Sequence, residues 1–497
     1  MSDAPRPPVP DGPYVVAGLG QAGLAAIAAL RRARPEARVI AWDASASAVV
    51  RHRARQLRRR GVESVVARPI GEALDRAGER ALVVRSPGIA RDAPPLREAR
   101  AHGCQVLDEL EIGWRLHRQP CIGITGTNGK GTTATLTAGL LRSRGLSVAV
   151  AGNFAHGPAL SDGGNSGADC IVCEASSFQL ELSDAFLPDI AVFTNLTPTH
   201  MHRHRSGARY ATVKARMFVR QRRPAAVSVI NIDDPFGRQL AAYLRSLGGT
   251  VIGYGSDPLA DVRLVGSSWD ERHSDVELIA HGRRASARVA LIGRHNVMNA
   301  VAAIATVGAC GIDLVDACDG IGSLAGPPAR LQRVDADLPF GIFVDYAHTR
   351  DGVVSVLGTL REIADRRPGA RLLVLTGPLP LDEGLDAGAW LTPVVAEFAD
   401  TVTVTTGHIS RVVDCAQVVA MARMRKAGGV TKAILDREAA IGDIVCSART
   451  GDVVLILSRG DLREMKIDQA GSRVEFDDVA SIRRACDRRA RGVRSCR

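Results

Sequence analysis

The feature that most constrains the fold is an alternation that runs along almost the whole chain. Short Val/Ile-rich runs are followed by longer Ala/Leu/Arg-rich stretches with helical periodicity. Such alternation is typical of α/β proteins with mostly parallel sheets, because each helix returns the chain to the same end of the sheet. The sequence therefore predicts α/β structure throughout, with apolar runs such as YVVAG, RVIAWD, CIGITG, DCIVCEA, DIAVFTNL, GIFVDYA and VVLILS as strands.

Three domains are expected in a chain of 497 residues, because domains commonly hold about 100–200 residues. We place them at residues 1–116, 117–325 and 326–497. The first and third should be Rossmann-like, and a Gly/Pro-rich stretch, GSLAGPPARLQRV, marks the second boundary. Shorter, more polar alternation from Asp261 to Leu291 predicts a small antiparallel layer beside the parallel sheet of the central domain.

Membrane insertion and secretion are not expected. No run of about 18 apolar residues occurs, and the first residues, MSDAPRPPVPDGP, are polar and proline-rich. The ten scattered cysteines are then expected to be reduced thiols of a cytoplasmic protein. Cys170 and Cys173 form a CxxC inside an apolar run, and core packing is the favoured interpretation because no second pair follows to complete a zinc site.

The net charge of +11 raises the possibility of nucleic-acid binding. However, the basic residues are spread along the chain apart from a basic tail, and aromatic residues make up only 4%, so stacking surfaces for bases are scarce. We favour affinity for anionic small molecules. Nearly all basic residues are arginine, and a lysine kept among them suggests a specific need for an amine; the five lysines are at positions 130, 214, 426, 432 and 466.

The strongest chemical motif is ITGTNGKGTT at residues 124–133, where an apolar run leads into a glycine-rich loop and then a helical stretch. Glycines let backbone N–H groups approach phosphate oxygens, and Lys130 would reach the terminal phosphates. A hydroxyl from Thr132 or Thr133 would complete a magnesium shell. The spacing departs from GxxxxGK[ST] because Gly131 follows the lysine. A plain glycine turn is the disfavoured alternative.

Phosphoryl transfer also needs a carboxylate for the metal near the end of a neighbouring strand. Glu174 meets this requirement, and His200 after the next apolar run is a second candidate ligand. The alternating histidines 200, 202 and 204 leave a zinc or copper site as an alternative. We disfavour it because no cysteine or carboxylate lies close in sequence to complete the ligand set.

A second glycine motif, GLGQAG at residues 18–23, follows the first apolar run, and Asp43 ends the next one. Alone, this pattern predicts a dinucleotide site, and an NAD-dependent oxidoreductase is the alternative it leaves open. The separate phosphate loop at residues 124–133 disfavours that alternative, because an oxidoreductase does not need one.

Together these motifs resemble the Mur ligases of peptidoglycan synthesis. The resemblance rests on GITGTNGKGTT, EASSFQLE, NLT…HMHRH, Tyr210 with Lys214, and GRHN…NA at residues 293–300. It is close over residues 14–310 and looser beyond. GLGQAG, Asp43, Ser86-Pro87-Gly88 and DELEIGWRL look like the D-glutamate-adding branch of the family in particular.

The resemblance implies an ATP-dependent enzyme with Mg²⁺ as cofactor. In this family a substrate carboxylate is phosphorylated to an acyl phosphate, and an amine then attacks to form an amide. The implied catalytic residues are Lys130, Glu174, His200 and Lys214, with Thr132, Glu174, His200 and Lys214, as a carbamate, on the metal. The ATP-binding residues implied are Gly126, Thr127, Asn128, Gly129, Lys130, Gly131, Thr132, Thr133, Asn296, Asn299, Arg330 and Asp345.

The resemblance also assigns the substrates. UDP-substrate binding is implied for Gly18, Leu19, Gly20, Gln21, Asp43, Ser86, Pro87, Gly88 and Asn153, and His295 is assigned to substrate or nucleotide. Acceptor binding is expected from His348, Arg350 and Ser458, with Arg459 and Arg463 as further candidates. A carbamate at Lys214 would turn an ammonium into an oxygen ligand, which arginine cannot do. The alternative for Lys214 is an ordinary exposed helix lysine.

Some positions depart from the family pattern. Thr199 and His202 stand where acidic residues are usual, so a second metal site is an open question. In the third domain DYAHTRD and VEFDDVASIRRA resemble the diamino-acid branch instead, and TGPLPLDEG lacks the lysine that the D-glutamate branch keeps there. The choice of acceptor is therefore the least determined part of the interpretation.

We accordingly expect a cytoplasmic, monomeric ligase that adds glutamate, with D-glutamate first, to UDP-N-acetylmuramoyl-L-alanine. A relative that uses L-glutamate or a diamino acid is one alternative. The other is a nucleotide-binding protein that has lost ligation.

Overall fold

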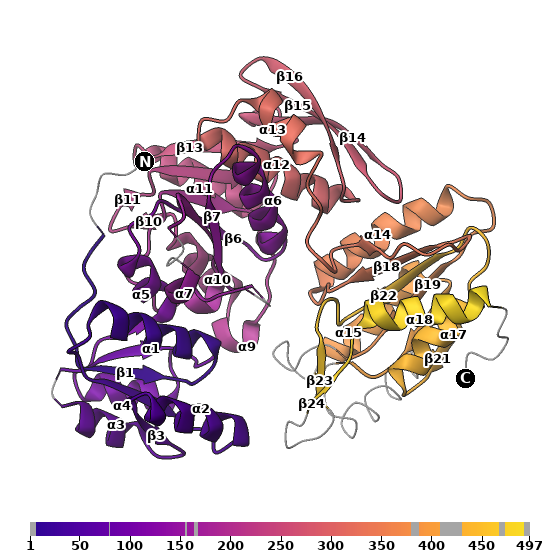
Figure 1. The fold of residues 1–497 in the computed structure, drawn as a ribbon. Helices are drawn as coiled ribbons and strands as arrows, with labels where there is room; N and C mark the ends of the chain where they lie inside the picture. The colour runs from indigo at the N-terminus through magenta and orange to yellow at the C-terminus, as the bar shows by residue number, and fades with distance from the viewer. Residues whose placement is uncertain are drawn as a thin grey trace.

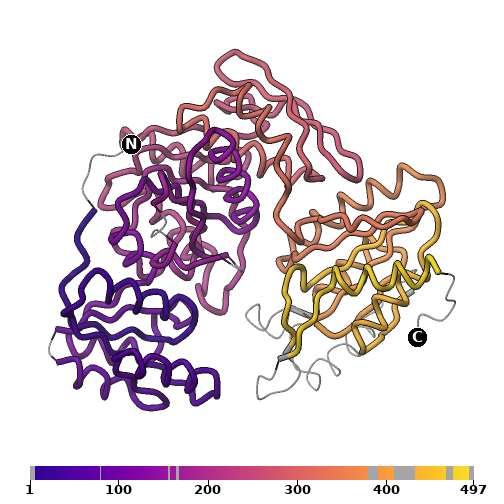
Figure 2. Tube along the Cα trace, viewed as in Figure 1, coloured from indigo at the N-terminus to yellow at the C-terminus, as the bar shows by residue number. Residues whose placement is uncertain are grey.

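The structure, a computed structural model, describes residues 6–78, 80–154, 157–163, 167–378, 387–407, 430–466 and 473–491. It contains three large sheets, each built from one continuous stretch of chain (Figure 1). The tube view shows the first and third sheet regions on different sides of the central one (Figure 2). The predicted three-domain α/β fold is confirmed.

The first sheet is parallel, with strand order β3-β2-β1-β4-β5. Its strands are β1 (Tyr14–Ala17), β2 (Val39–Asp43), β3 (Glu63–Val66), β4 (Leu82–Arg85) and β5 (Val106–Asp108). Its helices are α1 (Gln21–Ala33), α2 (Ala48–Arg59), α3 (Ile70–Ala77), α4 (Pro94–Ala101) and α5 (Glu109–Leu116). The strand order reverses between β1 and β4, and in open α/β sheets ligands bind in the crevice outside the carboxyl ends of the strands at such a reversal.

The central sheet has the order β16-β15-β14-β13-β12-β9-β6-β8-β7. Its parallel strands are β6 (Cys121–Thr125), β7 (Val148–Gly152), β8 (Cys170–Glu174), β9 (Ile190–Phe193), β12 (Val227–Asn231) and β13 (Thr250–Gly255). The predicted antiparallel layer is confirmed by β14 (Val262–Trp269), β15 (Ser274–Ala280) and β16 (Arg283–Val289). A separate hairpin pairs β10 (Val219–Arg220) with β11 (Arg223–Pro224).

The helices of the central region include two long ones packed against each other, α6 (Lys130–Ser143) and α12 (Arg294–Ala309). The others are α7 (Leu160–Gly163), α8 (Ser177–Leu180), α9 (Met201–His204), α10 (Gly207–Ala215), α11 (Pro235–Ser246) and α13 (Leu314–Ile321). The starts of α10 and α11 are set by Ser206 and Asp234, whose side chains accept N-cap hydrogen bonds.

The third sheet has the order β17-β18-β22-β19-β20-β21, and only β17 is antiparallel to its neighbour. Its strands are β17 (Gln332–Arg333), β18 (Gly341–Asp345), β19 (Leu372–Thr376), β20 (Thr401–Val404), β21 (Val430–Ala433) and β22 (Val453–Leu457). A hairpin joins β23 (Glu464–Lys466) to β24 (Arg473–Glu475), and the helices are α14 (Arg350–Asp365), α15 (Ala387–Phe398), α17 (Arg437–Ser447) and α18 (Asp478–Ala490).

The apolar runs are strands because both of their faces are covered. Every residue of β1, β6, β18 and β22 is buried, as expected for parallel strands between two helical layers. Cys170 and Cys173 are buried free thiols in β8, which confirms core packing for the CxxC pair. The expectation of reduced thiols fails at Cys446, which is disulfide-bonded. None of the described helices is both long and apolar enough to cross a membrane.

Candidate active site

Three strand ends of the central sheet meet around the glycine-rich loop. β6 lies between β8 and β9, so the loop after Thr125 has Glu174 at the end of one neighbour and Thr194 just after the other. Strand order turns around β6, and ligands of open α/β sheets bind at such positions. The strand order thus brings the phosphate loop and the predicted carboxylate of Glu174 together.

The backbone of the loop requires glycine at two positions. Gly126 and Gly129 have φ of +154° and +83°. A Cβ at Gly126 would lie 1.9 Å from Thr194 Oγ1, and one at Gly129 would lie 2.1 Å from Asn299 Oδ1. Because a side chain at either position would clash, and because both residues have positive φ, the conformation of the loop requires glycine at both positions.

The loop is braced from the end of β9. The carbonyl and the side-chain oxygen of Asn195 accept hydrogen bonds from the backbone N–H groups of Thr127 (2.8 Å) and Asn128 (2.9 Å). Thr194 Oγ1 donates to the carbonyl of Asn128 at 2.6 Å. Thr194 and Asn195 were not among the residues predicted for the site, although their position directly after a predicted neighbouring strand is a signal that could have identified them.

Lys130 and Glu174 carry the central charges. Lys130 Nζ donates to the carbonyl of Thr127 at 2.9 Å, and burial lowers the pKa of the lysine, while the nearby Glu174 carboxylate opposes that shift. Glu174 is 7% exposed, and Asn153 Nδ2 donates to its Oε1 at 3.1 Å. A Cβ at Gly131 would lie 2.9 Å from Glu174 Oε2. This carboxylate therefore lies against the first turn of α6, where a cation bound with phosphates would need oxygen ligands.

Lys214 is buried, with 1% exposure, on α10. Its Nζ donates to the carbonyl of Gly126 at 2.5 Å and lies 4.6 Å from the centre of the Tyr210 ring. Burial, and secondarily the Lys130 cation, hold its pKa well below the usual range. The exposed-lysine alternative is therefore wrong. A buried amine with a lowered pKa spends more time neutral, which is the form that reacts with CO₂.

The three histidines have different surroundings. His200 has a left-handed backbone (φ +56°), and burial, followed by the charge of His348, lowers its pKa to about 3. His202 is exposed, whereas His204 is fully buried and bonds to Ser177 Oγ at 3.0 Å. Within the described parts of the chain, no three His, Cys, Asp or Glu side chains form a metal-binding group, so the zinc or copper alternative finds no support.

Residues of the third sheet region reach the same loop. Thr349 Oγ1, at the N-cap of α14, donates to Asn128 Oδ1 at 2.9 Å. Asp345 is buried and accepts the N–H groups of Leu331 and Ala347, both at 2.6 Å. Burial, together with the Arg330 and Lys130 cations and against a hydrogen bond to the Tyr346 carbonyl, lowers the pKa of His348 to about 4. Because the Arg330 cation lowers the pKa of both His348 and Lys130, these three side chains lie close enough to interact electrostatically.

The start of α12 completes this surface. Asn299 packs on Gly129, and its Nδ2 donates to Asn296 Oδ1 at 3.3 Å. Both asparagines are buried, and burial lowers the pKa of the adjacent His295 to about 4. Thr132 is also buried, with 2% exposure in the first turn of α6.

The predicted UDP-substrate residues gather at the crevice of the first sheet. Gly18 has φ +97°, and a Cβ at Gly23 would lie 1.8 Å from its carbonyl oxygen. The Asp43 carboxylate accepts the N–H groups of Leu19 and Ser45, both at 2.8 Å. Ser86 Oγ donates to the carbonyl of Gly18 at 3.1 Å, next to Pro87 and the exposed Gly88.

One predicted residue of this set reaches across to the central region. Gln21 Nε2 donates to the carbonyl of Gly157 at 2.9 Å. Gly20 is the N-cap residue of α1, and the space where its Cβ would lie is open. The start of α1 is therefore hydrogen-bonded to the central region at Gly157.

The acceptor candidates fall into two groups. Arg350 and Arg463 are exposed. Ser458 is buried with φ +90°, and its hydroxyl bonds to Thr376 Oγ1 at 3.0 Å. Arg459 is also fully buried, and its guanidinium donates to the carbonyls of Gly407, Leu462, Glu464 and Phe476. Arg459 is therefore a structural residue, which corrects its candidacy as a donor to the acceptor.

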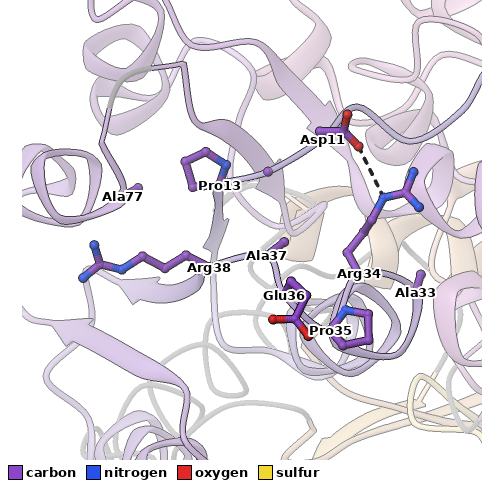
Figure 3. Close-up of a pocket in the computed structure, with 10 residues that line it drawn as sticks. Asp11, Pro13, Ala33, Arg34, Pro35, Glu36, Ala37, Arg38 and Ala77 are labelled. Atoms are coloured by element: carbon purple, nitrogen blue, oxygen red, sulfur yellow. Dashed lines mark ion pairs between the residues drawn. The ribbon is translucent and has the colours of Figure 1, made fainter.

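One cavity of the first region is lined by none of these residues (Figure 3). It measures about 600 Å³ and is lined by Asp11–Pro13, Ala33–Arg38 and Ala77. It adjoins the amino ends of β1 and β2, whereas parallel α/β sheets bind ligands at the carboxyl ends. Arg34 and Asp11 form an ion pair at 3.5 Å beside it.

Known protein families match the central and third regions of the chain. Residues 124–307 match the Mur ligase middle domain, and residues 329–460 match the Mur ligase glutamate ligase domain. A UDP-N-acetylmuramoyl-L-alanyl-D-glutamate–2,6-diaminopimelate ligase of Streptomyces coelicolor is 33% identical over 86% of this chain and 85% of its own. A UDP-N-acetylmuramoylalanine–D-glutamate ligase of a Synechococcus strain is 36% identical over 65% of this chain and 67% of its own.

A solved UDP-N-acetylmuramoyl-L-alanyl-D-glutamate–2,6-diaminopimelate ligase shares the fold with a TM-score of 0.56, at 25% identity over 84% of this chain and 94% of its own. The fold and site thus define an ATP-dependent ligase that joins amino acids to acids. The chain belongs to the Mur ligase family, whose members build peptidoglycan precursors.

Proposed function

We propose that this ligase adds glutamate, D-glutamate first, to UDP-N-acetylmuramoyl-L-alanine in the cytoplasm. The observation that carries the proposal is the meeting of Lys130, Glu174 and Lys214 around one glycine loop, with Thr349 of the third region bonded to that loop. The glycine loop of the first sheet, with Asp43 and Ser86, supports a nucleotide-linked substrate in the neighbouring crevice.

The charged residues of the site have different roles. Lys130 and Arg330 are cations close enough for Arg330 to lower the pKa of Lys130, and together they would neutralise the charge that develops on the transferring phosphoryl group of ATP. Backbone N–H groups at the start of α6, beside Gly129, add the field of a helix N-terminus. A carboxylate becomes a good electrophile once an acyl phosphate gives it a leaving group, which an amine can then displace.

Mg²⁺ fits the residues present, since the buried Glu174 carboxylate faces the first turn of α6. Bound there, it would neutralise phosphate charge. We propose Glu174, Thr132 and His200 as its protein ligands, with Lys214 joining them as a carbamate. The Lys214 amine is suited to that modification because its burial favours the neutral form.

The remaining site residues follow from their positions. Asn296, Asn299 and Asp345 would bind ATP, because they border Gly129 and Arg330. Asn153 would hold the end of the UDP-linked substrate near Glu174. For the acceptor we propose His348 and the exposed Arg350, since a guanidinium can pair with both oxygens of a carboxylate.

A diamino acid is the second candidate acceptor. It is favoured by the DYAHTRD segment around Asp345 and by the Streptomyces coelicolor relative, which covers more of the chain than the Synechococcus one. In that case the substrate would be the longer UDP-N-acetylmuramoyl-L-alanyl-D-glutamate.

Phosphate release in the presence of ATP and Mg²⁺ tests the proposal. UDP-N-acetylmuramoyl-L-alanine is combined in turn with D-glutamate, L-glutamate, lysine and diaminopimelate, and the longer substrate is run in parallel. We expect turnover that needs both the muramoyl substrate and a glutamate. Faster turnover of the longer substrate with diaminopimelate would replace the first acceptor assignment by the second. A protein that has lost ligation would release phosphate with none of these combinations.

A further inference from the structure

A buried ionic cluster joins the first sheet region to the central one. Arg85, the last residue of β4, is fully buried; it bonds to Asp108 Oδ2 at 2.5 Å and lies 3.4 Å from Glu181 Oε2. Arg203 of α9 has a side chain that is 7% exposed and bonds to the same Glu181 oxygen at 2.7 Å. Two arginines thus share one carboxylate across the boundary, in surroundings where each charge needs its partner.

The two arginines also share a carbonyl. Arg85 Nη1 and Arg203 Nη2 both donate to the carbonyl of Ile89, at 2.8 and 3.2 Å. Ile89 closes a turn in which its N–H bonds to the carbonyl of Ser86. Ser86 in turn bonds to the carbonyl of Gly18. The turn at residues 86–89 is therefore fixed at one end to the glycine loop and at the other to the two guanidinium groups.

Arg203 continues this connection into the central site. Its guanidinium carbon lies 3.9 Å from the centre of the Phe178 ring, and the His200 ring contacts Phe178 from 4.9 Å. Arg203 therefore touches both the 86–89 turn of the first region and the aromatic ring on which His200 rests.

We infer that Arg203 is a positioning residue that holds the 86–89 turn in the conformation required to bind the UDP-linked substrate. Its side chain contacts Glu181, Ile89 and Phe178, while its backbone N–H donates to the carbonyl of His200, a proposed metal ligand, at 2.9 Å. Its effect is transmitted through the Ile89 carbonyl, and Arg85 keeps Glu181 paired when Arg203 is replaced. The inference rests on the proposed function for the identity of the substrate.

The test compares Arg203→Met, Arg203→Lys and Arg209→Met. Arg209 is the matched control, because it forms another ion pair between the same regions, with Asp92 at 3.5 Å, but is partly exposed and does not reach the turn. For Arg203→Met we expect the KM for UDP-N-acetylmuramoyl-L-alanine to rise about tenfold, within the range of coupled sites. The Kd for ATP should stay within about twofold. Arg203→Lys should be intermediate, because one ammonium replaces a planar fork.

Hydrogen exchange of the free protein gives a readout that needs no substrate. In Arg203→Met the amides of residues 86–89 should exchange faster, while those of residues 121–145 are unchanged. An unchanged KM together with unchanged exchange overturns the inference. Weaker ATP binding with a general loss of thermal stability also overturns it, because that is the signature of a purely structural residue. If the unmodified protein turns over no muramoyl substrate, the proposed function fails while the exchange comparison still decides the role of Arg203.

Discussion

The molecule has two glycine loops on similar parallel sheets, and they are built for different tasks. The loop after β1 is bordered by Asp43, whose carboxylate is occupied by two backbone N–H groups. The loop after β6 is bordered by the partly buried Lys130, the buried Lys214 and the carboxylate of Glu174. Both loops use glycine to let the backbone approach an anion. The first loop has the surroundings of a binding site, whereas the second also has the charged groups that phosphoryl transfer needs. The side chains around the loop, and not the fold, separate the two.

The largest effect should come from removing the charges that only the second loop has. Lys130→Ala and Glu174→Ala should each lower ATP-dependent turnover by about 10²–10³-fold, because each group acts on the charged phosphates or their metal. Steady-state phosphate release measures this, and thermal unfolding checks the fold. Gln21→Ala, at the first loop, is the control and should change turnover far less. Near-normal turnover in either variant would show that the charged groups around the second loop are not needed for phosphoryl transfer.

Substitutions at Lys214 separate the effect of its charge from that of carbamate chemistry. Lys214→Arg should be nearly as inactive as Lys214→Ala, with losses on the order of 10²-fold, because guanidinium forms no carbamate. Lys432→Arg is the matched control, since this lysine lies on β21 and pairs with Asp443. Mass spectrometry of the intact protein with bicarbonate and magnesium should show the added CO₂ on the unmodified chain. Retained activity in Lys214→Arg contradicts the carbamate.

Asp43 tests whether the first loop binds UDP and not NAD. Asp43→Asn should raise the KM for UDP-N-acetylmuramoyl-L-alanine about tenfold with little change in kcat, as expected for loss of one charge-assisted contact. Asp75→Asn, on the exposed side of α3, serves as the control. Calorimetric titration with UDP and with NAD checks the ligand directly, and tight NAD binding unaffected by UDP would assign the loop to a dinucleotide.

Thr349 probes how the third region contributes to the second loop. Thr349→Val removes the hydrogen bond to Asn128 and the N-cap of α14, which is commonly worth about 1 kcal/mol. We expect the KM for ATP to rise about fivefold, in line with one lost hydrogen bond. Thr349→Ser keeps the hydroxyl and should behave like the unmodified protein. If both variants bind ATP normally, the contact does not serve the nucleotide.

The smallest effect concerns the boundary between the two loop regions and should leave turnover unchanged. Glu109 on α5 is buried, and its Oε1 accepts both the N–H and the hydroxyl of Ser161. Burial raises its pKa to about 7. Because this folded-state pKa lies above the ordinary value of 4.5, the folded protein favours the protonated form. The stabilisation is complete below about pH 4.5 and is lost as pH rises through 7.

Glu109→Gln should therefore be more stable than the unmodified protein at pH 8, by about 1–3 kcal/mol, and the difference should shrink toward pH 5. Denaturant unfolding at the two pH values measures it. A constant difference between the variants at all pH values would show that Glu109 stays ionised.

The sequence predicts those site residues that directly follow a recognisable strand, but not those whose partners are distant in the chain. The glycine loop at 124–133 and the carboxylate Glu174 could be predicted, because each follows directly from a recognisable apolar strand. The burial of Lys214 could not be read from its helix, since its partner is the carbonyl of Gly126 in a distant part of the chain. The same holds for Thr349 and Asn128, which meet only because two separate sheets are brought together.

Ser458 and Arg459 show the opposite error. Their position after a predicted strand is right for an acceptor site, because functional residues gather at strand ends. Yet both side chains are buried and bonded within their own region. Residue type and strand position do not say whether an arginine faces a ligand or holds neighbouring carbonyls.

The way each large sheet is made from one uninterrupted stretch has a further consequence. The chain passes from the second sheet region to the third once, through the segment that holds Arg330 between the left-handed residues Ala329 and Leu331. A single crossover in this segment would therefore be enough to graft an intact third region from one ligase onto the first two regions of another. Chimeras joined near Arg330 would keep every strand pairing of both parents, so they can test whether the choice of acceptor is transferred with the third region.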